Sequence, residues 1–271
     1  MPICYDRVMD TPLARRMFLL QYGAEPSPKW ISVRGADEHI LWMPIIGIAV
    51  ETDAGWVLLE TGMGRALLED TPARQIVYAS REQPWAVGED PLVAALESVG
   101  LRPEDFVLAA VSHLHVDHAG GIRTLTKAGV PVAVQGAELV FARERSTLEA
   151  AYYPTDYSDP DIRWRELEGD AELAPGVQAL FTPGHTPGHM SYRVDLPETG
   201  TWLFAVDAAC LGENIYERVP GGWTADPADE TRIENSLDRI LKEAKDLDAR
   251  LVPGHDQVFW NAVGHPPGGH R

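Results

Sequence analysis

Cysteine is scarce in this chain, which has only two in 271 residues, Cys4 and Cys210. Two cysteines cannot form the disulfide framework that stabilises small secreted domains. Such a low cysteine content is typical of proteins from a reducing compartment. We therefore expect a cytoplasmic protein whose core is held together by apolar packing rather than by disulfides.

Long apolar runs are also missing, since no stretch approaches the roughly 20 apolar residues that a membrane-spanning helix needs. The segment 17–20 is apolar and follows two arginines. It is too short for the core of a signal peptide, and no small-residue cleavage site follows it. The sequence thus predicts a protein without a membrane partner.

Basic residues are few, because 23 Lys and Arg stand against 41 Asp and Glu, which gives a net charge of −18 and an isoelectric point near 4.8. A surface with this charge repels phosphate backbones and anionic lipid headgroups, so nucleic acid and membrane surfaces are poor partners. Hydrophobic residues make up 45% of the chain, enough for a substantial core. We expect a folded domain of enzyme size, and the sequence leaves open whether it forms a homodimer.

No linker, charge block or low-complexity stretch divides the chain, so we expect a single domain over residues 1–271. Apolar runs typical of strands recur at 45–51, 56–60, 107–112, 130–134, 177–181, 190–194, 202–206 and 251–253. Helical patterns lie between several of them, notably at 91–99, ending before Gly100, and at 227–249, where Asp226 is the expected N-cap. Strands that alternate with helices predict an α/β domain.

Residues 141–170 break this alternation. Tyr152, Tyr153, Tyr157 and Trp164 stand there among charged residues and two prolines. We expect a surface excursion that is packed by its own aromatic rings, with a lid or a subunit contact as the alternative.

The strongest chemical signal is the run Ser112-His113-Leu114-His115-Val116-Asp117-His118-Ala119-Gly120-Gly121, which follows a predicted strand. It places three histidines and a carboxylate within six residues. Imidazole and carboxylate are ligands of divalent cations such as zinc. In an extended chain His113 and His115 point the same way, whereas Asp117 and His118 begin the next helix and face elsewhere. The motif therefore predicts a metal site, and one run can serve two adjacent metals.

More candidate ligands follow, each beside the end of a predicted strand. They are the tandem Thr182-Pro183-Gly184-His185-Thr186-Pro187-Gly188-His189, Asp207 after the strand at 202–206, and His255 after that at 251–253. A rigid sheet holds such residues while the metal stays accessible. Taken singly, an aspartate there often caps a turn, and a histidine in a Pro-Gly turn is usually solvated. Together with the first motif, they complete two coordination spheres.

This pattern resembles the signature of the metallo-β-lactamase superfamily, namely His-x-His-x-Asp-His followed by Gly-Gly and then by a distant His, Asp and His. The likeness is greater still to the N-acyl homoserine lactone lactonases. It covers roughly residues 44–260 and rests on the segments 112–121, 168–177, 181–191, 206–208, 213–220, 226–227 and 253–256. The resemblance implies an α/β fold, the αββα sandwich, in which two mixed β-sheets are flanked by helices and carry a dinuclear metal site.

The resemblance also implies which residues bind two divalent metal ions, most simply zinc, with iron, cobalt and manganese as alternatives. The implied ligands are His113, His115 and His189 for one ion, Asp117, His118 and His255 for the other, and Asp207 as a bridge between them. His185 matches a histidine that is not a ligand and is expected to orient its loop from outside the metal site. The remaining histidines His39, His265 and His270 match nothing in the family and are expected at the surface.

Two positions depart from the lactonase pattern. The family has Asp-Thr-Gly where this chain has Glu60-Thr61-Gly62, and the extra methylene is expected to disturb local hydrogen bonding more than metal binding. Lactonases of this group carry a tyrosine three residues after the bridging aspartate, where its hydroxyl assists the substrate carbonyl, but Cys210 stands there instead. Cysteine is a poor hydrogen-bond donor, so this assistance is either lost or supplied from elsewhere. A metal-binding thiol is the alternative.

The activity that the resemblance implies is quorum quenching, the hydrolysis of the lactone ring of N-acyl homoserine lactones. A hydroxide that bridges the metals would attack the carbonyl, and Asp117 would deliver a proton to the leaving alkoxide. The acyl tail of such a small-molecule substrate needs an apolar channel. Its candidate lining, which is otherwise core, is Met17, Phe18, Leu19, Leu20, Trp42, Met43 and Ile46.

Other functions use the same type of site. The main alternative is a hydrolase of another lactone, of a thioester as in glyoxalase II, or of a phosphotriester. The thioester version calls for a basic patch, and none is evident. A β-lactamase is disfavoured because no secretion signal is present. A flavodiiron-like redox scaffold is disfavoured because it needs acidic ligands in place of some histidines. A non-catalytic binding module is disfavoured because it would have no use for a complete open metal site.

Overall fold

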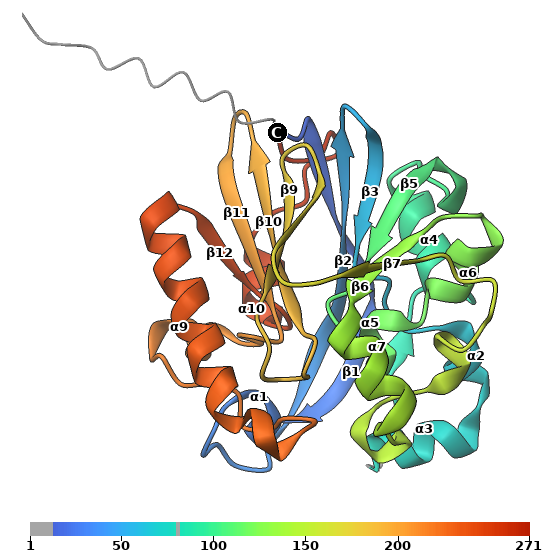
Figure 1. Cartoon of the computed structure of the whole chain (residues 1–271), viewed down its shortest axis with the longest axis vertical. Coiled ribbons are helices and arrows are strands. Elements are labelled where there is room, and N and C mark those ends of the chain that lie inside the picture. The colour runs from blue at the N-terminus through green and yellow to red at the C-terminus, as the bar shows by residue number, and fades with distance from the viewer. Residues whose placement is uncertain (1–12, 80–81) are drawn as a thin grey trace, which may run out of the picture.

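Two mixed β-sheets lie face to face in the computed structural model, which describes residues 13–79 and 82–271 (Figure 1). Cys4 lies outside these residues. The larger sheet has the strand order β4 (Trp85–Ala86), β1 (Arg16–Pro28), β2 (Ile40–Thr52), β3 (Gly55–Leu59), β5 (Phe106–Ala110), β6 (Val132–Gln135) and β7 (Trp164–Leu167). The smaller sheet has the order β12 (Arg250–Pro253), β11 (Gly200–Val206), β10 (Met190–Leu196), β9 (Val177–Phe181) and β8 (Ala171–Ala174).

Helices lie outside the two sheets and at one end of the sandwich (Figure 1). They are α1 (Lys29–Ser32), α2 (Arg65–Glu69), α3 (Thr71–Tyr78), α4 (Pro91–Ser98), α5 (Val116–Ala119), α6 (Ile122–Lys127), α7 (Gly136–Glu144), α8 (Gly212–Tyr216), α9 (Glu230–Leu247) and α10 (Gln257–Ala262). Figure 1 shows α9 outside the smaller sheet and α4 and α6 outside the larger one. The predicted sandwich of two mixed sheets flanked by helices is confirmed. None of the helices in the described residues is long and apolar enough to cross a membrane.

Alternation along the central strands builds two separate apolar layers. Val57 and Leu59 of β3 pack between the two sheets, whereas Leu58 packs outward under the helices. Because successive side chains of a strand point to opposite faces, a strand that is buried on both sides reads as a continuous apolar run. On the outside of the smaller sheet, Leu237 and Ile240 of α9 pack against β9 and β11. The sheets are thus fixed from both sides, and their strand ends are rigid supports.

All eight runs that the sequence marks as strands overlap strands of the structure, although those at 56–60, 107–112 and 130–134 extend one or two residues beyond them. Four further strands, β1, β4, β7 and β8, were not predicted. β1 is interrupted by a change of register between Gln21 and Gly23 and contains Pro26, which disguises its alternation. β7 is a short edge strand with the sequence Trp-Arg-Glu-Leu, whose charges hide it.

The two predicted helices are found, with changed ends. Asp90 caps α4, since its carboxylate accepts a hydrogen bond from the Val93 N–H at 3.3 Å. The second helix, α9, begins only at Glu230, because residues 227–229 form a 3₁₀ turn that Asp226 caps. It ends at Leu247, because Asp248 adopts the left-handed conformation with φ of 50°.

The expectation of an independently packed surface excursion at 141–170 was wrong. Tyr152, Tyr153 and Tyr157 are buried in the same apolar cluster as α4 and α6. Because the tyrosine rings are absorbed into this core, the segment places residues 149–151 beside the cavity described below.

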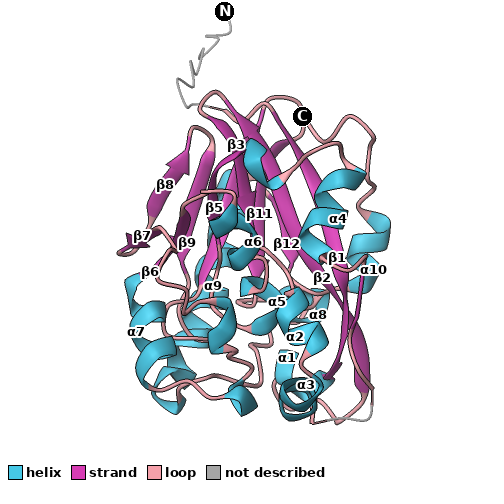
Figure 2. Ribbon diagram, turned by 90° about the vertical axis from the view of Figure 1, so that its right-hand side faces the viewer, coloured by secondary structure: helices cyan, strands magenta, loops and turns pink. Residues whose placement is uncertain are grey.

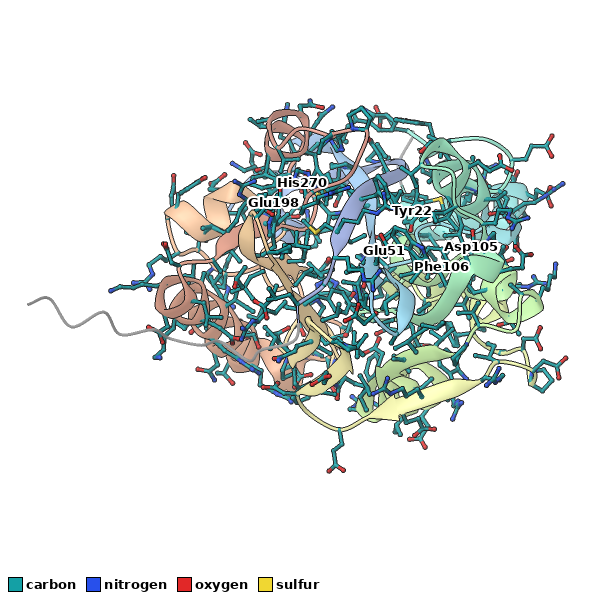
Figure 3. All side chains as sticks on the ribbon, turned by 90° about the horizontal axis from the view of Figure 1, so that it is seen from above. Tyr22, Glu51, Asp105, Phe106, Glu198 and His270 are labelled. Carbon is teal, nitrogen blue, oxygen red and sulfur yellow. The ribbon has the colours of Figure 1, made fainter. Side chains whose placement is uncertain are left out.

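The C-terminal histidine was also misplaced by the sequence analysis. His39 and His265 are exposed as expected, but His270 is buried against the Trp202 ring, with ring centroids 4.8 Å apart. Its backbone pairs with Met17, and the Thr199 N–H donates to the Arg271 carbonyl. Figure 3 accordingly shows His270 beside Glu198, over the turn between β10 and β11.

The loops that follow the predicted strands come together at one end of the sandwich, where α1, α2, α3, α5 and α8 also gather (Figure 2). The Met190 N–H donates to the Ser112 carbonyl at 3.1 Å and joins the larger sheet to the smaller one. The His255 N–H donates to the Cys210 carbonyl at 2.8 Å and joins the loops after β11 and β12. These bonds fix the relative positions of the candidate ligands.

Candidate metal centre

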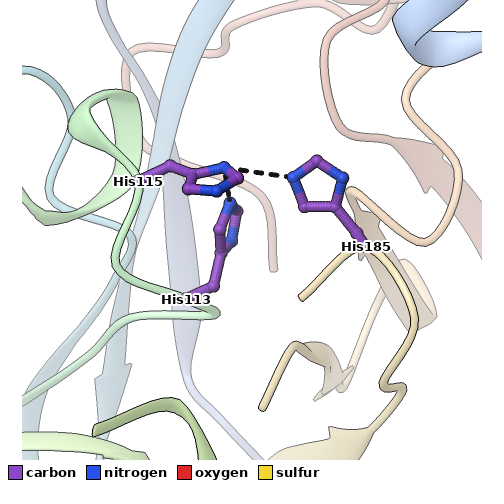
Figure 4. Close-up of side chains that lie close together, drawn as sticks. All are labelled: His113, His115 and His185. Carbon is purple, nitrogen blue, oxygen red and sulfur yellow. Dashed lines mark hydrogen bonds between the residues drawn. The ribbon is translucent and has the colours of Figure 1, made fainter. Parts of the chain in front are cut away.

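The motif after β5 bends so that two of its histidines face one another. His113 Nε2 lies 3.0 Å from His115 Nδ1 (Figure 4). The Ser112 hydroxyl lies 2.8 Å from His113 Nδ1 and fixes that ring from behind. The expectation that these two side chains project together is confirmed.

His185 completes this first group. Its Nε2 lies 3.2 Å from His115 Nδ1, so three ring nitrogens converge on one point, as Figure 4 shows. His185 lies in the loop that follows β9, and all three side chains are buried. Three converging imidazoles are a typical set of protein ligands for a catalytic zinc ion.

Asp117, His118 and His255 form a second group beside the first. Asp117 Oδ2 lies 2.9 Å from His118 Nε2 and 3.7 Å from His255 Nε2. His255 Nδ1 lies 3.0 Å from the Pro44 carbonyl and donates to it, which leaves Nε2 facing the group. Asp117 and His118 come from α5, as predicted, but His118 does not face away from the first pair, because its ring centroid lies 4.2 Å from that of His113.

Asp207 lies between the two groups. Its Oδ2 is 3.2 Å from His185 Nε2, and its Oδ1 is 3.0 Å from His255 Nε2 and 3.4 Å from His118 Nε2. A carboxylate that presents one oxygen to each group has the geometry of a bridging ligand.

His189 does not join either group, which corrects the choice made between the two histidines of the tandem. Its Nδ1 lies 2.9 Å from the Thr182 carbonyl, and its Nε2 accepts a hydrogen bond from the Asp207 N–H at 3.1 Å. Burial lowers the pKa of His189 to about 3, so the ring is neutral. Its one lone pair is therefore used by a backbone N–H, and no lone pair is left for a metal. The residue positions Asp207 instead.

Strand position is the signal that distinguishes the two histidines. His185, like His113, Asp207 and His255, follows the C-terminal end of a strand, whereas His189 immediately precedes β10. A residue at the start of a strand is held by the hydrogen bonds of the sheet and by its neighbours. The side chain of a residue in the loop after a strand is free to project toward the metal groups. Spacing within the tandem alone does not show this difference.

Glu60 lies behind His118 and holds that ring in place. Its carboxylate lies 2.5 Å from His118 Nδ1, accepts from the Ser112 N–H at 2.7 Å, and accepts from the Tyr192 hydroxyl at 2.5 Å. The extra methylene at this position therefore leaves a full set of hydrogen bonds, contrary to the expected disturbance. Glu60 itself adopts a left-handed conformation with φ of 65° directly after β3.

Glu138 is a structural anchor of the site that the sequence analysis missed. Its buried carboxylate accepts from the Leu114 N–H at 3.0 Å, the Gly188 N–H at 3.1 Å and the Tyr152 hydroxyl at 2.8 Å. It thereby joins the motif after β5 to the tandem after β9. A glutamate inside a helix such as α7 gives no local sequence signal of this role.

Burial keeps the first group of histidines neutral. It lowers the pKa values of His113 and His115 well below 6.5, and it lowers that of His185 as well. Asp207 raises the pKa of His185 but does not outweigh burial. Neutral imidazoles offer lone pairs, so the three converging nitrogens are suitable metal ligands.

The second group contains the ionised carboxylate of Asp117 and lies beside that of Asp207. Burial raises the pKa of Asp117, but the adjacent His118 outweighs it and brings the pKa to about 2. Burial lowers the pKa of His255, but Asp207 outweighs it and raises the pKa to about 9. Negative charge held in a buried place attracts positive charge, either as protons on the histidines or as a cation.

The residues present fit two divalent cations. His118 Nε2 is buried and makes no hydrogen bond, although carboxylate oxygens face it. In the first group, one nitrogen of His115 faces two others at 3.0 and 3.2 Å, and a single proton can satisfy only one of these pairs. A cation in each group satisfies all of these atoms with imidazole and carboxylate, the donors that zinc and related metals prefer.

Cys210 lines the same cavity without joining either group, since in the described part of the chain it belongs to no cluster of converging ligands. Burial and the charge of Asp207 raise the pKa of its thiol well above 9.0, so the thiol is protonated at neutral pH. A protonated thiol is a poor metal ligand. The side chain packs against Val33, Met43 and Leu211.

A cavity of about 330 Å³ opens over the two groups. Its lining includes five of the ligand-type side chains together with an apolar wall, which is formed by Trp30, Ile31, Met43, Val77, Val116 and Trp223. Of the channel residues that the sequence suggested, Met43 alone is among the described lining. Met17, Phe18, Leu19, Leu20 and Ile46 are core residues, and Trp42 is exposed elsewhere. Alternation in a strand buried on both faces does not reveal which face meets a cavity.

Residues 48–255 match the protein family described as the metallo-beta-lactamase superfamily. The chain belongs to the metallo-β-lactamase superfamily. The matched residues include both groups and Asp207.

Several relatives within this superfamily are similar over most of the chain. An N-acyl homoserine lactonase of Bacillus thuringiensis is 32% identical over 223 residues, which is 80% of this chain and 83% of the relative. The N-acyl homoserine lactonase AttM of Azorhizobium caulinodans is 30% identical over 263 residues, which is 93% of this chain and 97% of the relative.

A solved structure has the same metallo-β-lactamase sandwich. It is an N-acyl homoserine lactone hydrolase with the product N-hexanoyl-L-homoserine bound at its catalytic metal centre. It superposes with a TM-score of 0.80 at 27% identity and covers 94% of this chain and 98% of that one.

Proposed function

We propose that this metallo-β-lactamase-fold protein is a metal-dependent hydrolase that opens the ring of N-acyl homoserine lactones and so acts in quorum quenching. One observation carries the proposal: two groups of buried imidazoles and carboxylates, bridged by Asp207, form the floor of a cavity with an apolar wall. The similarity to curated N-acyl homoserine lactonases at 30 and 32% identity supports the choice of substrate.

The metal ligands that we propose differ from the sequence prediction at one position. They are His113, His115 and His185 for one cation, Asp117, His118 and His255 for the other, and Asp207 between them. We propose zinc, with iron, cobalt or manganese as alternatives, because the donors are imidazole nitrogens and carboxylate oxygens. When bound, two such cations would polarise the lactone carbonyl and make a water molecule nucleophilic at neutral pH.

Asp117 is the residue that we propose to move the proton. Its pKa of about 2 means that the carboxylate is ionised at neutral pH, which is the form that can accept the proton that the attacking water loses. It then returns this proton to the ring oxygen, which leaves as the hydroxyl of N-acyl homoserine. Asp117 Oδ2 lies 2.9 Å from His118 Nε2 and 3.7 Å from His255 Nε2, so the carboxylate is beside the reaction centre for both steps.

Charge in the cavity distinguishes the proposed substrate from several alternatives. The lining carries the carboxyl groups of Glu25 and Glu149 besides those of the site, and no lysine or arginine among its described residues. β-Lactams and glutathione thioesters carry carboxylates, and the described lining has no basic side chain to pair with them. An N-acyl homoserine lactone is uncharged, and so is a phosphotriester, which therefore stays the second candidate.

Hydrolysis of a substrate panel tests the proposal. The purified protein, loaded with zinc, is assayed on N-hexanoyl homoserine lactone, a glutathione thioester, a phosphotriester and a β-lactam. We expect kcat/KM for the homoserine lactone to exceed that for each of the others by at least about 100-fold, the scale that a mismatched charge or reacting group produces. Comparable or faster turnover of the phosphotriester would replace the lactonase proposal with the second candidate.

Three further features of the protein are its domain organisation, its location and its oligomeric state. We propose that residues 1–271 form one domain, because the inter-sheet core draws on strands from both halves of the chain. The scarcity of cysteine supports a cytoplasmic location. A homodimer stays a prediction, to be tested by light scattering.

A further inference from the structure

Two polar side chains of the cavity wall lie outside the proposed metal ligands. The hydroxyl of Tyr78, at the end of α3, donates a hydrogen bond to Glu25 Oε2 at 2.8 Å. Glu25 belongs to β1, and both residues line the same cavity as Asp117, Asp207 and His255. Neither residue stood out in the sequence, because they are 53 positions apart and belong to no motif.

The second carboxyl oxygen of Glu25 faces no other described residue at hydrogen-bonding distance. Within the described part of the chain, the carboxyl group of Glu25 accepts a hydrogen bond from Tyr78, and this bond fixes Oε2. Both side chains are half-buried, so Oε1 is accessible from the cavity. Glu25 is also close enough to Asp117 and His255 for their charges to alter its pKa. The pair therefore lies beside the reaction centre and offers a polar group to a ligand there.

We propose that the Tyr78–Glu25 pair binds the amide group of an N-acyl lactone and so selects substrates with an amide next to the ring. This inference rests on the proposed function. The amide is attached to the ring carbon adjacent to the lactone carbonyl, so a substrate whose carbonyl lies over the metal centre carries its amide along the cavity wall. Beyond the amide, the acyl chain reaches the apolar residues Trp30 and Ile31.

The chemistry of the pair matches an amide in either protonation state. An ionised Glu25 accepts a hydrogen bond from the amide N–H, and a protonated Glu25 donates one to the amide carbonyl. The carboxyl group of Glu25 therefore offers the amide a hydrogen bond whether or not it carries a proton. An alkyl lactone has no amide to bond to the pair, so when it binds, the free carboxyl oxygen of Glu25 has no hydrogen-bond partner in the substrate.

Selectivity between two lactones tests the proposal. We measure kcat/KM for N-hexanoyl homoserine lactone and for γ-decalactone, which has an alkyl chain and no amide, and take the ratio of the two. Glu25→Leu, which keeps the volume and removes the polar group, is expected to lower this ratio about 10-fold. Tyr78→Phe, which frees Glu25 from its anchor, is expected to lower the ratio about 3-fold.

Glu25→Gln is the matched control, because an amide side chain still accepts from Tyr78 and still offers a hydrogen bond to the substrate. We expect its ratio to stay within about 2-fold of the wild-type value. Metal content is measured for every variant and is expected to be unchanged, because Glu25 and Tyr78 are not metal ligands in this account.

The outcomes separate the two proposals. If the wild-type protein opens neither lactone, the proposed function fails. If the wild-type protein opens both and Glu25→Leu lowers the two kcat/KM values by the same factor, or changes neither, the pair does not recognise the amide and this inference is overturned. A loss of selectivity in Glu25→Leu that Glu25→Gln does not show supports it.

Discussion

The assignment of His185 in place of His189 makes a sharp prediction about metal binding. Zinc sites with four ligands bind with about 10–16 kcal/mol, so one imidazole of such a site contributes about 3–4 kcal/mol. His185→Ala removes one of three converging nitrogens and is expected to weaken binding of one metal about 100- to 1,000-fold, with the fold retained. Activity is expected to fall with the metal.

His189→Ala is expected to behave differently. It removes the acceptor of the Asp207 N–H and a bond to the Thr182 carbonyl, and it leaves a cavity in the core. The expected loss is about 2–4 kcal/mol of folding stability, while both metals still bind to the folded protein. His189→Ala therefore lowers the melting temperature most, and His185→Ala lowers the metal content most.

Elemental analysis of both variants after dialysis against buffered zinc, together with their thermal unfolding curves, measures these two effects. The reasoning is refuted if folded His189→Ala loses a metal while His185→Ala retains two. A result in which both variants keep both metals refutes the coordination scheme for the first group as a whole.

Three further predictions concern residues around the site. Glu60→Gln is expected to weaken metal binding about 10- to 100-fold, because it alters the group that accepts the hydrogen bond from His118 Nδ1–H. A zinc titration of this variant that matches the wild type would contradict this prediction. Cys210→Ala is expected to leave metal content and kcat/KM nearly unchanged, and Cys210→Tyr is expected to raise kcat/KM several-fold. Loss of a metal from Cys210→Ala would instead show that the thiol is a ligand. The pKa of Asp156 is raised from 3.8 to about 7 by burial, partly offset by Arg123, and neither carboxyl oxygen has a hydrogen-bond partner. The folded chain thus binds one proton more than the unfolded chain between these pH values, so stability falls by up to about 4 kcal/mol as pH rises from 4 to 7. Asp156→Asn is expected to remove this fall, and an unchanged pH dependence in urea unfolding would show that Asp156 is not its source.

The sequence predicts most of the site because its ligands follow strands that are apolar without interruption. His113, Asp207 and His255 each stand just beyond such a strand, and the sheet brings those ends together. The choice between His185 and His189 failed because it depends on where the loop after β9 ends and β10 begins. That boundary is set by tertiary hydrogen bonds, such as the one from the Asp207 N–H, rather than by local sequence.

The groups around the ligands were less predictable. Glu138 and Glu60 hold the site through bonds to residues 14 to 132 positions away, and the Tyr78–Glu25 pair joins two elements that share no motif. The cavity wall was mostly mispredicted because β1 and β2 are buried on both faces, so alternation does not indicate the face that meets the substrate. Contacts of this kind depend on how the two sheets pack.

Product analysis tests the central claim most directly. N-hexanoyl homoserine lactone is incubated with the zinc-loaded protein, the products are separated by chromatography, and their masses are measured by mass spectrometry. The account predicts a single product heavier than the substrate by one water, N-hexanoyl homoserine, formed by the metal-loaded protein and not after removal of the metals with a chelator. Unchanged lactone in the presence of two bound metals per chain, or release of hexanoic acid by cleavage of the amide, would contradict it.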